Sequence, residues 1–284
     1  LLSCVEFHRT DDWDDSEEQW IAMKPSIDQA DALVVLAGIG CNGLIRELGE
    51  RFRKPILINS VAGLSGAGGV AGLSASPLKL EVHGFYLWKD YAYRINIMHA
   101  RKVIQNTQIL CATRFGSPIS FSSPDTLNSH IHVTAKLGTR FRYINIHELI
   151  DQMTPAVEGG NPTTPGRITP DLSPEDQAEA ERICDELIKG AVDVRMTREN
   201  ILPSIIAFVM VRKHMCLNDC NAFAMPCPDA CSTRRLNEGK FTMCLTHALN
   251  MEAGIASACE YDTSAALSEQ ALIAVSGKRT YMGN

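Results

Sequence analysis

Three acidic residues in the C-terminal third of the sequence lie where carboxylates could bind a metal ion. Asp229 follows an expected strand at 221–225, Glu238 lies in a polar turn, and Asp262 closes an expected strand at 255–259. In open parallel sheets, ligands bind beyond the carboxyl ends of the strands. Hard ions such as Mn²⁺ and Mg²⁺ prefer carboxylate oxygens. Each acid taken alone fits an ordinary helix cap or a solvated loop equally well, but together they make a divalent-metal site a candidate.

A glycine-rich segment is the second feature with chemical potential. Gly38 to Gly43 (GIGCNG) matches G-x-G-x-x-G between an expected strand and an expected helix, the context in which such loops bind a pyrophosphate. A dinucleotide site of this kind has an acid at the end of the second strand, where this sequence has Asn59. We therefore predict a structural turn, with a nucleotide-dependent oxidoreductase as an alternative function.

The cysteines and histidines give weaker signals. Two C-x3-C pairs occur where zinc knuckles would use C-x2-C, so their cysteines are predicted to pack as small apolar side chains. These cysteines are Cys216, Cys220, Cys227 and Cys231. His130 and His132 lie on opposite sides of an expected helix, which is a poor geometry for sharing an ion, and we predict that both are solvated.

The composition limits the classes of protein to consider. The chain has 284 residues, 45% hydrophobic and 21% charged, with a net charge of -6 and a pI of about 5.8. An acidic chain lacks the basic face that nucleic acids require, and no apolar run reaches the roughly 20 residues that span a bilayer. The ten cysteines fit reduced thiols in a chain long enough to build a core. We predict a soluble, cytoplasmic protein without nucleic-acid or membrane partners.

The hydrophobic pattern predicts an α/β fold with parallel sheets, in two consecutive units. The expected elements are strands at 32–37, 56–58, 108–113 and 141–146 and helices at 44–52 and 125–137. We predict a first domain over residues 1–102 and a second over 103–256. Residues 257–284 then begin the region of the metal site.

Several local patterns complete the expected layout. The apolar, aromatic segment 80–98 is predicted to be a helix, and the Gly/Ser/Ala stretch 63–72 is predicted to be flexible. Ser173 is a strong N-cap, because Pro174 follows at the first helical position and acids fill the first turn. Thr263 is predicted to cap the last helix.

Residues 241–284 resemble the L-fucose isomerase-like family, which includes L-fucose, D-arabinose and L-arabinose isomerases. The resemblance rests on a Cys before an apolar helix, a turn from Asn250 to Ile255, a strand ending in C-E-x-D, and a closing G-K-x-x-x-M-G-N segment. The residues that carry it are Cys244, Gly254, Cys259, Glu260, Asp262, Gly277 and Gly283. Tyr261 replaces the small residue that is usual in the family's C-E-G-D.

The resemblance implies two Rossmann-like, three-layer domains followed by a β-rich C-terminal domain that these residues do not include. It implies an aldose–ketose isomerase, an intramolecular oxidoreductase that converts a sugar through an ene-diol. The implied cofactor is Mn²⁺, or Mg²⁺ or Co²⁺, bound by Asp262 and by Glu238 or Asp229, with a histidine beyond Asn284 as a further ligand. Asp262 and Glu238 are then also the predicted catalytic residues.

The resemblance also has implications for partners. Related isomerases place residues of the first domain beside a neighbouring subunit's site, so we predict a homo-oligomer with the aromatic segment 85–93 as a contact surface. A non-catalytic or regulatory sugar-binding relative of the same fold remains the alternative function.

Overall fold

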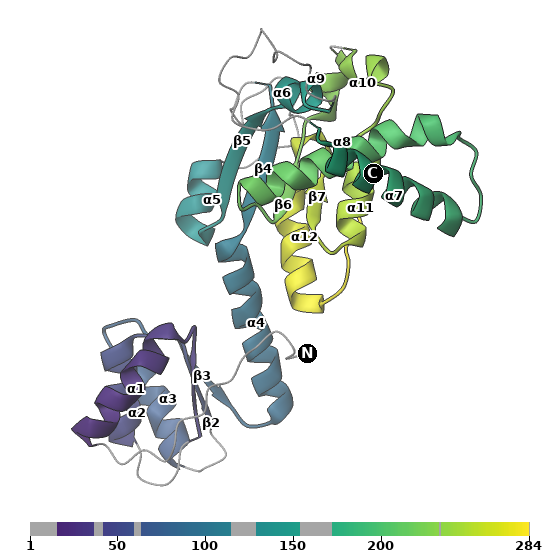
Figure 1. Ribbon diagram of the computed structural model, residues 1–284. Helices are drawn as coiled ribbons and strands as arrows, with labels where there is room; N and C mark the ends of the chain where they lie inside the picture. The colour runs from purple at the N-terminus through teal and green to yellow at the C-terminus, as the bar shows by residue number, and fades with distance from the viewer. Residues whose placement is uncertain are drawn as a thin grey trace. The chain divides into compact units, whose positions relative to one another are not determined.

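The computed structural model has a mixed α/β fold with two parallel sheets (Figure 1). It describes residues 16–36, 42–59, 64–114, 129–153, 172–232 and 234–283. The chain divides into two compact units, residues 1–99 and 100–284, and helix α4 (Trp88–Asn106) runs across the division. Most of the glycine segment Gly38 to Gly43 lies outside the described residues, and helix α2 begins at Asn42.

The first unit contains a sheet with the strand order β1-β2-β3. Its elements are α1 (Glu17–Gln29), β1 (Leu33–Val35), α2 (Asn42–Phe52), β2 (Ile56–Asn59), α3 (Leu64–Ser74) and β3 (Val82–Phe85). Ile56 and Ile58 of the central strand pack with side chains of α1, α2 and α3, whereas Leu57 packs with α4. Alternate side chains of β2 thus hold helices on both faces of the sheet, because successive residues of a strand point to opposite sides.

Two expectations for the first unit are wrong. Residues 80–98 contain β3 and the start of α4, because Val82–Phe85 pairs in parallel with β2 instead of coiling. The stretch predicted to be flexible lies largely in α3, despite its glycines. A Cβ at Gly69 would lie 3.0 Å from Ile45 Cδ1, so the missing side chain lets α3 lie close to α2.

The second unit contains a parallel sheet with the strand order β5-β4-β6-β7 (Figure 1). Its strands are β4 (Gln108–Thr113), β5 (Arg140–Asn145), β6 (Ala222–Ala224) and β7 (Ala256–Ala258). Its remaining helices are α5 (His130–Leu137), α6 (Ile146–Asp151), α7 (Pro174–Gly190), α8 (Arg198–Leu217), α9 (Cys227–Ser232), α10 (Arg235–Glu238), α11 (Cys244–Glu252), the 3₁₀ turn η1 (Cys259–Tyr261) and α12 (Thr263–Ser276). The strands expected at 108–113 and 141–146 are confirmed, the second one residue earlier in the chain.

Helices cover both faces of this sheet. Leu110 and Phe223 face a cluster with side chains of α6 and α8, while Ile109 and Cys111 face a cluster with Ala266 of α12. The strand residues of β6 and β7 on the α12 side are all alanines with no exposed surface: Ala222, Ala224, Ala256 and Ala258. Small side chains at these positions allow α12 to pack close to the sheet.

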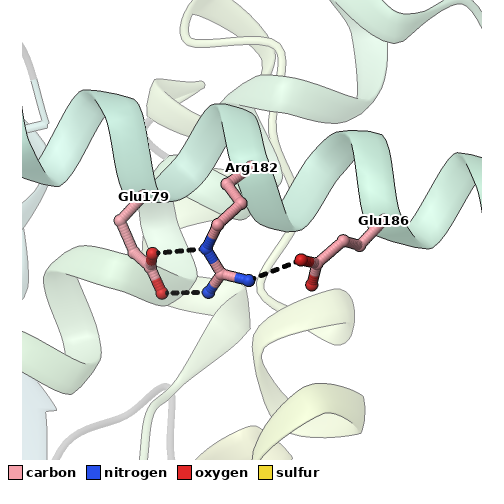
Figure 2. A network of polar contacts seen from close by, with 3 residues as sticks. All are labelled: Glu179, Arg182 and Glu186. Atoms are coloured by element: carbon pink, nitrogen blue, oxygen red, sulfur yellow. Dashed lines mark hydrogen bonds and ion pairs between the residues drawn. The ribbon is translucent and has the colours of Figure 1, made fainter.

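Helices α7 and α8 form a packed pair. The predicted cap of α7 is confirmed, because Ser173 Oγ accepts the Asp176 N–H at 3.2 Å and Asp176 accepts the Ser173 N–H. On the exposed side of α7, Arg182 bonds both Glu179 and Glu186 (Figure 2). Exposed pairs of this spacing contribute only about 0.3–0.5 kcal/mol each. The position of α7 therefore depends mainly on its packing against α8.

Helix α8 is the most apolar long helix in the described part of the chain. By length and composition it is the one described helix that could cross a membrane. In the structure, Met210 and Val211 are buried in the cluster on the sheet, and Ile205 is buried with side chains of α7. Its apolar surface is thus shared between two packing partners.

Two substitutions on α3 test whether close helix packing requires its glycines. Gly72→Ala is expected to stabilise the first unit by about 0.5–1 kcal/mol, because alanine favours helix and a Cβ there meets no atom within 4 Å. Gly69→Ala should gain nothing or lose stability, because the buried Ile45 must move. Urea unfolding followed by circular dichroism measures both. Equal stabilisation by the two changes would show that the α2–α3 approach does not constrain position 69.

Candidate functional site

The carboxyl ends of β6 and β7 remain joined after both strands end. The Met225 N–H donates to the Ala258 carbonyl at 3.4 Å, and the Tyr261 N–H donates to the Met225 carbonyl at 3.0 Å. This pairing holds the start of α9, which follows β6, against η1, which follows β7. Side chains far apart in sequence therefore meet at one edge of the sheet.

Three side chains with metal-ligand atoms meet there. The sulfurs of Cys227 and Cys259 and a ring nitrogen of His247 all lie within 4.8 Å of one another. The two sulfurs are 3.3 Å apart, too far for a disulfide and close enough for a thiol hydrogen bond. The residues come from the first turn of α9, from α11 and from η1.

The ring of His247 is held in place by two contacts. It is only 4% exposed, and it stacks on Phe223 of β6 with ring centroids 5.5 Å apart. Nδ1 lies 2.9 Å from Ser257 Oγ, which also accepts a hydrogen bond from Asn250 Nδ2 at 3.1 Å. Its Nε2 is buried and has no hydrogen-bond partner among the described residues.

Burial and the short sulfur contact determine the protonation of this cluster. The Cys259 thiol and burial together raise the pKa of the Cys227 thiol far above its usual range. Burial lowers the pKa of His247 to about 4. The cluster therefore holds a protonated Cys227 thiol and a neutral imidazole at neutral pH. Neutral imidazole is the form of histidine that binds metal ions.

Asp262 has a defined structural duty. It is the N-cap of α12, and its Oδ1 accepts the Ala265 N–H at 2.8 Å. The prediction that Thr263 caps this helix is therefore wrong by one residue. The Thr263 hydroxyl instead contacts His130 Nε2 at 3.1 Å. An aspartate caps as well as a threonine does, and η1 brings Asp262 to the cap position.

The other two predicted acids lie on neighbouring elements. Glu238 is exposed at the end of α10, which is a short helix and not the expected turn. Asp229 is in α9, but its side chain lies outside the described residues. Helix α9 packs against both α10 and η1. The elements that carry Asp229, Glu238 and the residue before Asp262 are thus adjacent at the carboxyl edge of the sheet.

A buried carboxyl that the sequence analysis did not single out lies on α12. Glu269 is 5% exposed, and its Oε2 accepts the Ser257 N–H at 2.7 Å. β7 is the edge strand of the described sheet, so no further described strand pairs with the Ser257 N–H. The Glu269 carboxylate accepts this hydrogen bond instead. Burial raises the pKa of Glu269 to about 7, and the charge of Asp262 adds to the increase.

The two histidines of α5 differ in their surroundings. His132 is exposed, as predicted, whereas the expectation that His130 is solvated is wrong. His130 stacks flat on Phe141 with centroids 3.7 Å apart, and its Nδ1 lies 2.6 Å from the Tyr143 hydroxyl. Burial lowers the pKa of His130 to about 4. It is a neutral core residue that joins α5, β5 and the start of α12.

The cysteine prediction is wrong at Cys216, which is exposed at the end of α8. Cys220 and Cys227 pack against the apolar cluster on the sheet, as predicted. Cys227 also lies beside Cys259 and His247. The side chain of Cys231 lies outside the described residues. Local spacing could not find this cluster, because its members are spread over three elements. One feature of the sequence does indicate the cluster: Cys227 and Cys259 each follow a short apolar strand, and the ends of parallel strands lie at the same edge of a sheet.

Comparison of the sequence with known protein families and with curated proteins finds no match.

The raised pKa of Glu269 predicts a pH-dependent stability. Its folded pKa of about 7 exceeds the value of about 4.3 for an unperturbed glutamic acid, so the folded chain holds a proton that the unfolded chain releases. The stability that this proton gives is complete below about pH 4 and is lost as the pH rises through about 7, by at most about 4 kcal/mol. Glu269→Gln should lack this loss. The free energies of unfolding of both proteins are to be measured with urea between about pH 4.5 and about pH 8. If the two free energies change with pH in the same way, Glu269 does not have a raised pKa.

Proposed function

We propose that this chain is the α/β part of a metal-dependent aldose–ketose isomerase. The observation that carries the proposal is the packing of α9 against both α10 and η1, which gathers the elements bearing Asp229, Glu238 and Asp262 at the carboxyl edge of the second sheet. Ligands bind at this edge in open parallel sheets. The resemblance of residues 241–284 to the L-fucose isomerase-like family supports the same site.

The donor set suits the proposed ion. Mn²⁺ and related hard cations prefer carboxylate oxygens. Of the Asp262 carboxylate oxygens, Oδ1 bonds a described backbone N–H, while Oδ2 has no hydrogen bond to a described residue. Asp262 would hold the ion with Glu238 or Asp229. When bound, the ion would polarise the sugar carbonyl.

The residues of this chain would then orient the sugar and move the proton. Glu238 is exposed, so its carboxylate is accessible to a sugar that binds from solvent. One carboxylate would take the proton from C2, the carbon beside the aldehyde carbon, and return it to C1. The proton of the C2 hydroxyl would move to the C1 oxygen, so that the aldose becomes a ketose through an ene-diol. Such a base works best when its pKa lies near the working pH, a condition that a neighbouring carboxylate can create.

The proposal includes a finer fold and an assembly. Each unit would be a Rossmann-like, three-layer domain, and the protein would act as a cytoplasmic homo-oligomer. Support for assembly comes from the first unit, where Tyr86, Leu87, Trp88 and Tyr93 are all more than half exposed. Light scattering of the complete protein tests this part, and a monomer mass at micromolar concentration would refute it.

Asp262→Asn tests the metal site without removing the cap. Asparagine caps helices about as well as aspartate, so the free energy of unfolding without metal should change by less than about 0.5 kcal/mol. Loss of the charge should lower Mn²⁺ affinity at least tenfold, by roughly the amount that disturbed metal sites lose. Manganese content and aldose–ketose conversion are to be measured on the complete protein beside the parent.

Glu199→Gln is the matched control, since it removes one charge from an exposed position in the first turn of α8. It should leave both manganese content and conversion unchanged. Normal manganese occupancy in Asp262→Asn would refute its role as a ligand. If the parent protein binds a sugar but neither takes up Mn²⁺ nor converts the sugar, the non-catalytic sugar-binding alternative is favoured. The role of Asp262 as a helix cap fits that alternative too.

A further inference from the structure

We propose that Cys227, His247 and Cys259 form a second metal site, which binds a Zn²⁺ ion through two thiolates and one imidazole. This site is separate from the carboxylate site and does not depend on the proposed sugar chemistry. Its donors are two sulfurs and a nitrogen, which zinc binds readily and which suit Mn²⁺ and Mg²⁺ poorly. Among the described residues, it is the one group of three such side chains whose ligand atoms converge.

The sulfur separation is close to that of a tetrahedral ion. Zinc–sulfur bonds of about 2.3 Å and a zinc–nitrogen bond of about 2.0 Å place two sulfurs about 3.8 Å apart, and a sulfur and a nitrogen about 3.5 Å apart. The Cys227 and Cys259 sulfurs are 3.3 Å apart, and all three ligand atoms lie within 4.8 Å of one another. A shift of about half an ångström would bring the sulfurs to the tetrahedral separation, and the ion would draw the imidazole nitrogen to its own bonding distance.

The hydrogen bond of the His247 imidazole leaves one ring nitrogen available to a metal ion. His247 Nε2 is buried, in a residue that is only 4% exposed, and has no hydrogen-bond partner among the described residues, which is unfavourable for a buried polar atom. Metal-binding histidines usually donate the proton of the other ring nitrogen to a fixed acceptor. Here Ser257 Oγ lies 2.9 Å from Nδ1, and Asn250 holds Ser257 from α11. An ion on Nε2 would satisfy the remaining atom.

Binding of the ion is a balanced exchange. Each thiol gives its proton to solvent, each sulfur donates a lone pair to the ion, and the neutral imidazole loses no proton. No oxidant or reductant takes part. Cys227 and Cys259 are both partly exposed, so the ion can enter and a water can occupy the fourth position.

The test uses the full chain, reduced and stripped of metal with a chelator. Titration with Co²⁺ should give one bound ion per chain, with the thiolate-to-cobalt absorption of a sulfur-bound ion in the near ultraviolet. Zn²⁺ should displace it. Zn²⁺ should also protect Cys227 and Cys259 from alkylation, as read by mass spectrometry, while Cys216 stays reactive because it is exposed on α8.

Variants separate ligands from neighbours. Cys227→Ser should lower Zn²⁺ affinity more than about 100-fold, whereas Ser257→Ala, which removes the hydrogen-bond partner of His247 Nδ1 and of Asn250 but no ligand, should lower it by about 10–100-fold. Cys216→Ser is the control and should match the parent. The alkylation measurement on the unaltered chain keeps the test decisive even where a variant folds poorly. Absence of the thiolate absorption, or equal affinity in Cys227→Ser and the parent, would overturn the proposal.

Discussion

The parallel pairing of β6 with β7 is the interaction on which the candidate sites depend. The register places Ala222 beside Ala256 and Ala224 beside Ala258. The hydrogen bonds of Met225 with Ala258 and Tyr261 extend it past the strands. A shift of one residue would turn each side chain of β7 to the opposite face of the sheet. Cys259 would then point away from His247, and α12 would lose the alanine surface on which it packs.

Much of the fold follows from patterns that are short in sequence. The strands at 56–58 and 108–113 are buried apolar runs, and the start of α7 combines a Ser, a Pro and two acids within four positions. These signals are local, so the elements that they predict do not depend on contacts with distant parts of the chain. Local patterns do not predict the structure of segments whose conformation depends on tertiary contacts. Val82–Phe85 is a strand because β2 offers it hydrogen bonds, and α3 tolerates its glycines because α2 lies close.

The candidate sites show the same division between local and tertiary information. The positions of Asp229 and Asp262 after strands could be predicted, because a strand end is visible in the sequence. The burial of His130 could not, because it depends on Phe141, Tyr143 and Thr263 arriving from other elements. The meeting of Cys227 with Cys259 also requires the order of strands in the sheet. Knowing only that β6 and β7 are neighbours would have been enough to suggest it.

The backbone between Cys259 and Asp262 separates the two proposed sets of metal ligands. Glu260 and Tyr261 both have left-handed conformations, with φ of 54° and 60°. This turn leaves Cys259 beside His247, sends the Tyr261 ring into the cluster under α12, and delivers Asp262 to the cap. A left-handed residue other than glycine costs about 1–2 kcal/mol. The Tyr261 side chain has no exposed surface, and burial of a large apolar side chain contributes about 1.5–3 kcal/mol, which offsets that cost. A large residue can therefore occupy this turn because it is also part of the core, and the same turn lies between the Cys259 sulfur and the Asp262 carboxylate, each of which we propose as a metal ligand.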